Sequence, residues 1–471
     1  MRTCWIRLFC LAMVLCISLV SSGIAENNQT IAIDWNSRYT YAQLEDQLKQ
    51  INAAYPEISE LYPIGRSFQE RSLWCMELTN KAVPAENKTG IAVFANIHGG
   101  ERESASSAMY FAWWLATESQ TEQVKAILDA YTVYVIPVIN PDGYEQSFVY
   151  NTRQNLRPRD LNGNGIPFSD PYTDIDGDGY IATLYRGTAA AQPNRRETAT
   201  FGMESPDWDK NGLLGDDPRN SGIDMNRTFD YQWNRYDIET KNSKNGVIGS
   251  NSWASAGSGP ATEPEIQAVQ NFLYNKDIDA LATLHTGIQC VLYPWCYRPY
   301  DAAVDSDDIL FMKDVAAQMA AAYQAYTGRG FYTKSSYEDY PTNAEMIDFA
   351  YGRLNIHAYT IEVYDPGKSE DGAVEACKWE NELPEAKWVF YDQEQLTAMG
   401  LNVASLKDAN GQGLKEGEGL WFYTSSTAQM VDKAPQDQQA MVEGCRDALL
   451  VMIRSEPYGQ GYTKPAYLDW Q

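Results

Sequence analysis

The clearest pattern along the chain is a series of short apolar runs bounded by turn residues. Residues 91–97, 132–139, 280–284 and 358–363 are apolar at nearly every position. Strands that are apolar on both faces are typical of a sheet that is covered on both sides. The pattern therefore predicts buried β-strands at these places.

Helical patterns alternate with the apolar runs. Leu44, Leu48 and Ile51 recur at helical spacing, which predicts a helix from Tyr41 to Ala54. Further helices are predicted at 104–117, 122–130, 263–274, 309–326 and 436–453. This alternation of strands and helices predicts an α/β fold with helices on both faces of one sheet.

Two segments interrupt the alternation. Residues 160–218 are polar and rich in Asp, Asn and Gly, and residues 364–433 form a mixed segment after the last predicted strand. Neither segment resembles a flexible linker between domains. We therefore expect one domain over 35–458 that carries both segments as insertions, followed by a short aromatic tail at 459–471.

The first residues have the pattern of a signal peptide. Two arginines precede an apolar stretch at 8–20 that is too short to span a bilayer, and Gly23 and Ala25 suit a cleavage site. We expect residues 1–25 to be removed and the protein to be secreted, extracellular or periplasmic, without further membrane association. The alternative is an uncleaved membrane anchor.

The charge balance narrows the classes of partner. The chain has 63 Asp and Glu residues against 37 Lys and Arg, with a net charge of -26 at pH 7. This balance argues against nucleic acid as a partner and favours cations. The eight cysteines are sparse and include no CxxC pair, which argues against a disulfide framework or a thiolate zinc site. Pairing of Cys290 with Cys296 stays open.

The most informative residues are the histidines, because the chain has only three. His98 directly follows one predicted strand and begins the segment His98-Gly-Gly-Glu101, and His285 follows another. In open α/β sheets, ligands bind at the carboxyl ends of the strands. Two imidazoles and one carboxylate at such an edge predict a catalytic zinc site with one open position. The alternative is that these histidines are structural.

A carboxylate inside an apolar strand is the next candidate. Glu362 lies within the strand at 357–363, where an unpaired charge is costly and indicates a partner or a chemical task. Beside a zinc site it would act as a general base. Strand alternation places His357 on the opposite face, so we expect a structural role for His357.

An amide and a guanidinium lie side by side at Asn226 and Arg227. A guanidinium fork can bind a carboxylate with two charge-assisted hydrogen bonds. The alternative for this pair is an ordinary surface ion pair.

In their order along the chain, these segments resemble the zinc metallocarboxypeptidases of the carboxypeptidase A type. The resemblance covers about Tyr39 to Tyr364 and implies a single catalytic domain, with a central mixed, mostly parallel twisted sheet of about eight strands flanked by helices. The matching segments are Ile64-Gly-Arg-Ser67, His98-Gly-Gly-Glu101, Asn140-Pro-Asp-Gly143, Asp224-Met-Asn-Arg227, Thr262-Glu-Pro-Glu265, His285 and Thr360-Ile-Glu362.

The resemblance also implies roles for single residues. It makes His98, Glu101 and His285 the zinc ligands and Glu362 the general base. Asn226 and Arg227 would bind the terminal carboxylate of the substrate. The remaining roles fall on Arg153 as the carbonyl-polarising arginine, Tyr340 as the substrate-capping tyrosine and Ile347 near the floor of the side-chain pocket, with Arg157, Arg159 and Tyr337 as competitors.

The implied activity is hydrolysis of the C-terminal peptide bond by a secreted, zinc-dependent metallopeptidase. The partners would be peptide or protein C-termini, and we expect a monomer. Ile347 would favour an apolar or aromatic last residue. Because the matching pattern begins near Tyr39, we expect no long inhibitory prosegment.

Two other functions stay open. A related zinc peptidase could act on cell-wall peptides with D-amino acid or gamma-glutamyl linkages. A catalytically dead, calcium-dependent binding module is the alternative of a different class, although such proteins usually lose a ligand or the base. A serine hydrolase is disfavoured because the chain has no GxSxG motif.

The acidic insertion contains a repeated cation-loop pattern, in which oxygen side chains alternate along the chain and a glycine follows. This pattern predicts structural calcium, although the glutamate expected at the twelfth position is absent. Further ligands would come from Asp170, Asp216 or Asp217, and the alternative is a solvated acidic loop. The predicted calcium ligands are Asp160, Asn162 and Asn164, Asp174, Asp176 and Asp178, and Asp207, Asp209 and Asn211.

Overall fold

The computed structural model describes residues 31–219, 222–233, 256–364, 385–425, 428 and 437–455. The predicted signal peptide at 1–25 and the predicted tail at 459–471 lie outside the described residues. The limits of the domain, 35–458, therefore stay a prediction.

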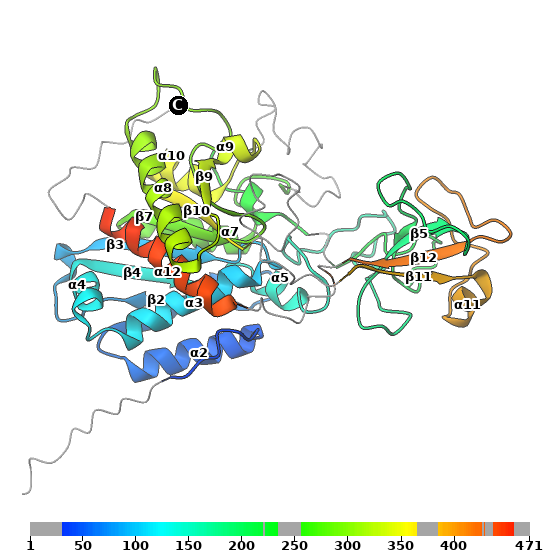
Figure 1. The fold of residues 1–471 in the computed structure, drawn as a ribbon, viewed down its shortest axis with the longest axis horizontal. Helices are drawn as coiled ribbons and strands as arrows, with labels where there is room; N and C mark the ends of the chain where they lie inside the picture. Colours follow the sequence, from blue (N-terminus) through cyan, green and yellow to red (C-terminus); the bar gives the residue numbers. More distant parts are fainter. Residues whose placement is uncertain are drawn as a thin grey trace, which may run out of the picture. The chain divides into compact units, whose positions relative to one another are not determined.

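An eight-stranded sheet forms the centre of the fold (Figure 1). Its middle strands are parallel neighbours, and they are the strands that the apolar runs predicted: β4 (Tyr131–Ile136), β3 (Thr89–Ala95), β7 (Ile278–His285) and β10 (His357–Val363). The outer strands are β1 (Ser59–Arg66) and β2 (Ser72–Leu78) on one side, and β8 (Gln289–Tyr293) and β9 (Tyr332–Ser335) on the other. Antiparallel pairs join β2 to β4 and β8 to β10, so the sheet is mixed, as predicted.

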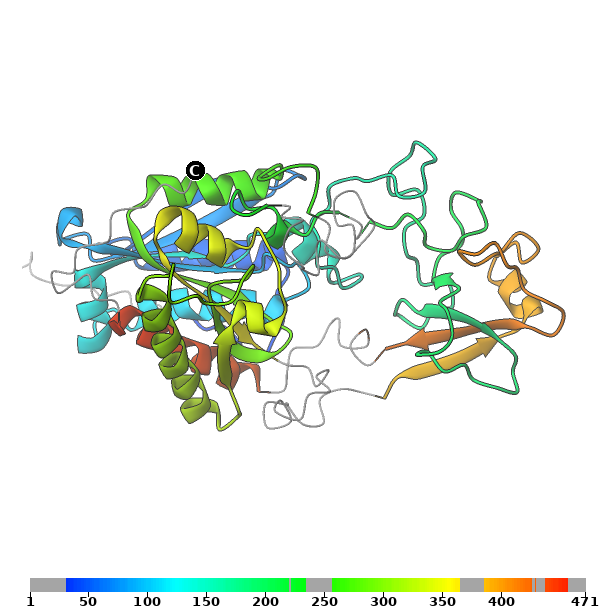
Figure 2. The ribbon, with the colours of Figure 1, turned by 90° about the horizontal axis from the view of Figure 1, so that it is seen from above.

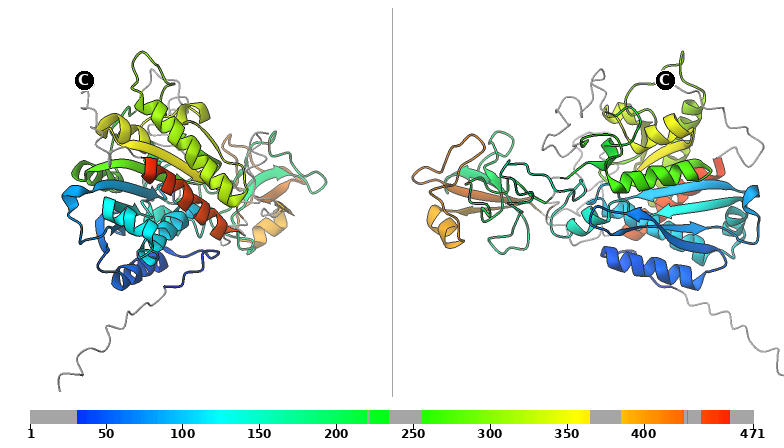
Figure 3. Two further views of the ribbon diagram at one scale, coloured as in Figure 1. Left: turned by 60° about the vertical axis from the view of Figure 1, so that its left-hand side comes forward. Right: turned by 180° about the vertical axis from the view of Figure 1, so that it is seen from behind.

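Helices cover both faces of this sheet (Figure 2). On one face, α7 (Pro264–Asn275) and α10 (Met346–Leu354) bury an apolar cluster that includes Phe94 and Phe272. On the other face, α3 (Arg102–Thr117) and α8 (Asp308–Thr327) both pack against α12 (Gln438–Ser455) (Figure 3). The remaining helical elements are α2 (Tyr41–Ala54), η1 (Ala85–Asn87), α4 (Glu122–Ala130), α5 (Pro141–Gln146), η2 (Met225–Arg227) and α9 (Ser336–Asp339).

Local sequence explains where the helices begin. Thr40 accepts a hydrogen bond from the backbone of Gln43, whose side chain bonds back to Thr40, and this capping box starts α2 at the predicted residue. Thr121 caps α4 by accepting from Val124 N–H. The fold class predicted from the sequence is confirmed.

A second sheet was not predicted. It has four antiparallel strands in the order β11-β12-β5-β6, and its own apolar cluster contains Leu184, Leu420 and Phe422. The two insertions build it together, because β5 and β6 come from the first and β11 and β12 from the second. The bounds are β5 (Thr183–Gly187), β6 (Gly202–Met203), β11 (Lys387–Tyr391) and β12 (Gly419–Thr424), with α11 (Gln393–Ala398) between the last two.

The structure also bears on cysteine pairing and membrane insertion. Cys290 and Cys296 are buried and both are free thiols. In the described part of the chain, no helix combines the length and apolar character that crossing a membrane requires.

Candidate metal centre and active site

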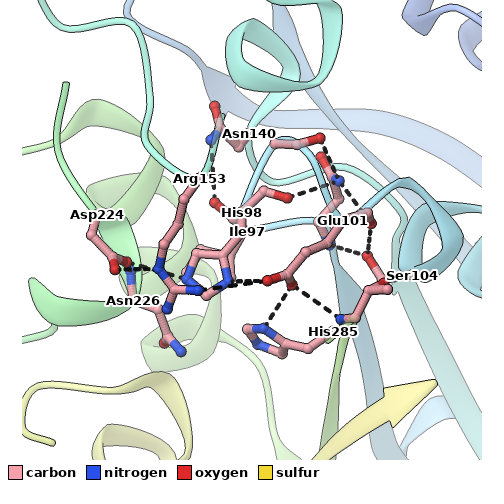
Figure 4. Close-up of polar contacts among 12 residues, drawn as sticks. Ile97, His98, Glu101, Ser104, Asn140, Arg153, Asp224, Asn226 and His285 are labelled. Atoms are coloured by element: carbon pink, nitrogen blue, oxygen red, sulfur yellow. Dashed lines mark hydrogen bonds and ion pairs between the residues drawn. The ribbon is translucent and has the colours of Figure 1, made fainter. Parts of the chain in front are cut away.

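The three predicted zinc ligands meet at the carboxyl ends of β3 and β7 (Figure 4). Their candidate ligand atoms all lie within 4.8 Å of one another. The Nδ1 atom of His98 is 2.8 Å from Glu101 Oε1, and the Nδ1 atom of His285 is 3.0 Å from Glu101 Oε2. Because β3 and β7 are parallel neighbours, the residues that end them are brought to one point from distant parts of the chain.

The turn between His98 and Glu101 depends on its two glycines. A Cβ at Gly99 would lie 2.2 Å from the backbone of Gly143, and a Cβ at Gly100 would lie 1.6 Å from Asn151 Oδ1. The side-chain amide of Asn96 donates to the carbonyls of His98, Gly99 and Glu101, each at 3.1 Å. These contacts hold the loop in the form that turns Glu101 toward the two histidines.

The second ring nitrogen of each histidine, Nε2, also has a polar partner. His98 Nε2 is 3.2 Å from Asp224 Oδ1, and His285 Nε2 is 3.3 Å from Thr283 Oγ1. Such contacts orient an imidazole and set which nitrogen faces a metal. Each Nδ1 atom therefore faces the common centre.

The charge states of Glu101 and His285 suit a cation. Burial alone would raise the pKa of Glu101, but His98 and His285 outweigh it and hold the pKa well below its usual range. Burial lowers the pKa of His285, which keeps that imidazole neutral. Metal ligands must be deprotonated, and the donor set of two imidazoles and one carboxylate fits zinc.

Asp224 is a site residue to which the sequence assigned no role. It is fully buried, and Arg153, Arg227 and His98 outweigh the effect of burial and hold its pKa well below the usual range. The only sequence signal was its place directly before Met225-Asn226-Arg227. Its contact with His98 joins residues far apart in the sequence, so nothing local marks it.

Glu362 lies next to the metal centre on β10, where it is the register partner of His285 on β7. Its Oε2 is buried and has no hydrogen-bond partner among the described residues. Burial, followed by the charge of Glu101, raises its pKa well above the ordinary value. His357, on the same strand, packs against Phe311 with ring centroids 5.1 Å apart.

Of the three candidate arginines, Arg153 is the one that reaches the metal centre. Its Nε is 2.6 Å from Asp224 Oδ2, and its Nη1 is 3.7 Å from Glu101 Oε1. The other two have different partners: Arg157 pairs with Glu263 at 2.8 Å, and Arg159 donates to a backbone carbonyl.

The proposed carboxylate-binding pair lies in η2. Asn226 Oδ1 accepts from the backbone N–H of Met346 at 3.0 Å, which fixes the orientation of the amide. Arg227 is 1% exposed, and its Nη2 lies 3.3 Å from the hydroxyl of Tyr340. Tyr340 thus contacts Arg227, whereas the backbone N–H of Tyr337 donates to the carbonyl of Trp295.

Ile347 is the last of the predicted substrate residues. It is 1% exposed and belongs to the main apolar cluster, together with Met346 and Phe349 on α10. The polar side chain of α10's N-cap, Glu345, contacts Arg227 instead, with Oε1 2.9 Å from Nη1.

Comparison with known proteins decides the family. A profile described as zinc carboxypeptidase matches residues 44–377, which is more than half of the chain. The chain belongs to the zinc carboxypeptidase family. Membership implies zinc, in agreement with the ligand set above.

Curated members of the zinc carboxypeptidase family are distant relatives. Mast cell carboxypeptidase A of Rattus norvegicus is 23% identical over 341 residues, which cover 70% of this chain and 66% of that protein. Carboxypeptidase E of Caenorhabditis elegans is 29% identical over 150 residues, which cover 30% of this chain and 31% of that protein. The chain therefore spans less than two thirds of the length of these relatives.

Solved structures of zinc carboxypeptidases share the fold. Carboxypeptidase A from Helicoverpa armigera aligns with a TM-score of 0.52 at 16% identity, over 78% of this chain and 74% of that one. Bovine thrombin-activatable fibrinolysis inhibitor, solved in complex with tick carboxypeptidase inhibitor, aligns with a TM-score of 0.50 at 19% identity, over 71% of this chain and 88% of that one. At these identities the likeness shows the fold.

The zinc carboxypeptidase profile spans the acidic insertion, whose three loops share one hydrogen-bonding pattern. Asp160 accepts from the backbone N–H groups of Gly163 and Gly165, both at 2.8 Å. Asp174 accepts from the backbone N–H groups of Gly177 and Gly179 in the second loop. Asp207 accepts from the backbone N–H of Gly212 in the third loop. The first aspartate of each loop therefore shapes its own backbone.

Some of the predicted calcium residues gather and others do not. Asn162 and Asn164 donate to Asp209 Oδ2 at 2.7 and 3.0 Å, and Asn211 donates to Asp216 at 2.9 Å. Calcium in these loops stays a prediction. In the described part of the chain, the carboxylates whose ligand atoms lie within 4.8 Å of one another form two groups, Asp170 with Asp207 and Asp209, and Asp174 with Asp176 and Glu204.

Proposed function

We propose that this protein is a secreted, zinc-dependent metallopeptidase that removes the C-terminal residue of peptides. The observation that carries the proposal is the convergence of His98, His285 and Glu101, whose ligand atoms lie within 4.8 Å of one another, beside Glu362, whose Oε2 has no hydrogen-bond partner among the described residues. Burying a carboxylate without a partner costs free energy, so its presence indicates a chemical task.

His98, Glu101 and His285 would hold the zinc ion. Bound there, zinc supplies Lewis acidity, which lowers the pKa of a water molecule and polarises a peptide carbonyl. Asp224 would keep the imidazole of His98 in its ligand orientation through the 3.2 Å contact at Nε2.

Glu362 would act as the general base and then as the general acid. Its Oε2 would take a proton from the attacking water and pass it to the nitrogen of the leaving amine. Arg153 would stabilise the negative charge that develops on the carbonyl oxygen, because its guanidinium already reaches to within 3.7 Å of Glu101.

Asn226 and Arg227 would confine cleavage to the last residue of the peptide. The amide and the guanidinium are both buried, and a carboxylate bound in a dry site gains more from charge-assisted hydrogen bonds than one at the surface. The hydroxyl of Tyr340, 3.3 Å from Arg227 Nη2, would close over the bound carboxylate.

The test compares two peptides that differ only in their last group, a free carboxylate or a carboxamide. We expect mass spectrometry to show loss of one residue from the free acid, and at least a hundred-fold slower reaction of the amide, because the amide cannot pair with Arg227. A chelator should abolish the reaction and added zinc should restore it. Internal cleavage, or equal rates on both peptides, would overturn the proposal.

A further inference from the structure

The two faces of the four-stranded sheet differ in what they carry. One face forms the apolar cluster that contains Leu184, Leu420 and Phe422. Side chains alternate between the faces of a strand, so the residues next to these three point to the other face. That second face, which we call the aromatic face, carries large rings on three adjacent strands: Tyr185 on β5, Trp421 and Tyr423 on β12, and Trp388 and Phe390 on β11 (Figure 1).

The rings of the aromatic face form a continuous group. The ring centroids of Trp388 and Tyr423 are 4.6 Å apart, those of Phe390 and Trp421 are 5.3 Å apart, and those of Trp388 and Tyr185 are 5.5 Å apart. The four rings on β11 and β12 are all partly exposed. A second packed layer would bury such large side chains, so the aromatic face is open in the described part of the chain.

A cavity of about 370 Å³ lies against Trp388 and Tyr423. The rest of its wall is Ala386 and the loop at 192–196, which supplies two amide side chains and two guanidinium groups. Ligand sites for small molecules and single sugar units have volumes of this order, and they combine apolar walls with a few polar groups. The cavity therefore has the composition of a binding site.

The charge of this cavity is opposite to that of the whole chain. Its lining contains arginines and no Asp or Glu, although the chain has a net charge of -26. Arg195 is exposed, its Cζ lies 5.3 Å from the centre of the Tyr423 ring, and its Nη1 donates to the Tyr423 hydroxyl at 3.1 Å. Arg195 has no carboxylate partner among the described residues, so its charge is available to an anion.

These groups together fit an acidic sugar polymer. One side of a sugar ring is a flat array of C–H groups that packs on an aromatic ring, and its hydroxyl groups accept hydrogen bonds from amides and guanidinium groups. A carboxylate on the sugar would pair with Arg195 through charge-assisted hydrogen bonds. A group of neighbouring rings suits a ligand that repeats the same ring along its length.

Two other polymers fit the aromatic face less well. An extended peptide adds to a sheet through the backbone groups of an edge strand, whereas these rings project from the face of the sheet. Nucleic acid needs a basic surface along its whole backbone, and the strongly acidic composition of the chain opposes it.

We propose that the aromatic face binds an acidic polysaccharide, with sugar rings stacked on Trp388 and its neighbours and a carboxylate paired with Arg195. This binding function is separate from peptide hydrolysis and does not rest on it. Such a site would hold the protein on a polysaccharide surface.

The experiment measures binding of the full chain to polygalacturonate, alginate and hyaluronate by isothermal titration calorimetry at physiological ionic strength. We expect at least one of these acidic polymers to bind, and its methyl ester, which lacks the charge, to bind at least ten-fold more weakly. Trp388→Ala and Arg195→Gln should each weaken binding at least ten-fold, because each removes one of the two groups that contact the sugar. Trp388→Phe keeps a ring and should keep most of the affinity.

Trp208→Ala is the matched control. Trp208 is 57% exposed and belongs to the same insertion, but it lies in an acidic loop, where its Nε1 donates to Thr173. Its affinity for the polysaccharide should equal that of the unmodified protein. All variants should cleave a short peptide at the normal rate, because none of these residues belongs to the metal centre.

Several results would overturn the proposal. They are failure to bind all three acidic polymers, equal affinity for a polymer and its methyl ester, tighter binding of single-stranded DNA, or affinities that Trp388→Ala and Arg195→Gln leave unchanged. If Trp388→Ala does not fold, Arg195→Gln decides, because that side chain is exposed. Absence of peptide hydrolysis would count against the function proposed above and leave this binding site standing.

Discussion

Carboxylates serve two different purposes in the two sheets of this protein. At the edge of the eight-stranded sheet, Glu101 and Asp224 bind other side chains, and their contacts converge on two histidines. In the insertion that contributes to the four-stranded sheet, Asp160 and Asp174 accept hydrogen bonds from the backbone of their own loops. The same residue type thus forms a chemical site in one region and shapes the chain in the other.

The difference follows from what surrounds each carboxylate. The strands that carry His285 and Glu362 are buried along nearly their whole length, so an ionisable group there needs either a partner from another element or a chemical task. The acidic loops have short polar segments with exposed glycines, so the backbone supplies the partners. Substitutions in the first region should therefore change chemistry, and those in the second should change stability.

Glu362→Gln should give the largest effect. We expect kcat/KM to fall by about a thousand-fold, because a general base typically contributes 10²–10⁴-fold and the amide cannot take a proton. Zinc content and melting temperature should stay close to those of the unmodified protein. The measurement is steady-state kinetics together with elemental analysis, and near-normal turnover would remove Glu362 from the mechanism.

Asp224→Asn should have a smaller effect on the same site. The variant keeps the shape of the side chain but loses the charge that contacts His98 and Arg153, so we expect zinc affinity to fall about 10–100-fold. Competition with a chelator of known affinity measures this change. Thr283 makes the corresponding contact to His285 without a charge, so Thr283→Val is the control and should lose less affinity. An unchanged affinity in Asp224→Asn would show that the charge is not needed to orient the imidazole.

Gly212→Ala should reduce stability without changing the chemistry. The glycine has a φ of +85°, and a Cβ there would lie 2.2 Å from the carbonyl oxygen of Ser405, so we expect a loss of about 1–3 kcal/mol. Gly163→Ala is the control, because its φ is +75° but no atom lies within 4 Å of the added Cβ. Denaturant unfolding should give a lower free energy of unfolding for Gly212→Ala than for Gly163→Ala. Equal values would show that the backbone near Ser405 moves aside without cost.

Calcium removal tests the acidic loops, and its expected effect is the smallest of the four. If the loops bind calcium, a calcium-selective chelator should lower the melting temperature by a few degrees, because a ligand that binds only the folded state stabilises it. Asp174→Asn should reduce this response. A melting temperature that does not depend on calcium would identify the insertion as acidic loops without an ion.

The two regions also differ in how well their sequence predicts them. The central strands were predicted because each is a continuous apolar run, and α2 was predicted to its last residue because Leu44, Leu48 and Ile51 mark one buried face. The four-stranded sheet was not predicted, because β5 pairs with β12 across about half of the chain and both strands are short. No local pattern records such a pairing.

The site shows the same division. His98, Glu101 and His285 could be found because histidine is rare in this chain and two of the three follow predicted strands. The contact of Asp224 with His98 could not be found, because it joins elements that are far apart in the sequence. Rare residue types at the ends of predicted strands indicate ligands, whereas a group that orients a ligand is found only from the fold.

The zinc content of the purified protein tests the central claim most directly. Elemental analysis should find about one zinc per chain in the unmodified protein, and less than a tenth of that in a His98→Ala, His285→Ala double variant that unfolds at a similar temperature. The assignment of this metal centre would be contradicted by an unmodified protein that contains no zinc after dialysis against a zinc-containing buffer. A double variant that keeps its zinc would also contradict it.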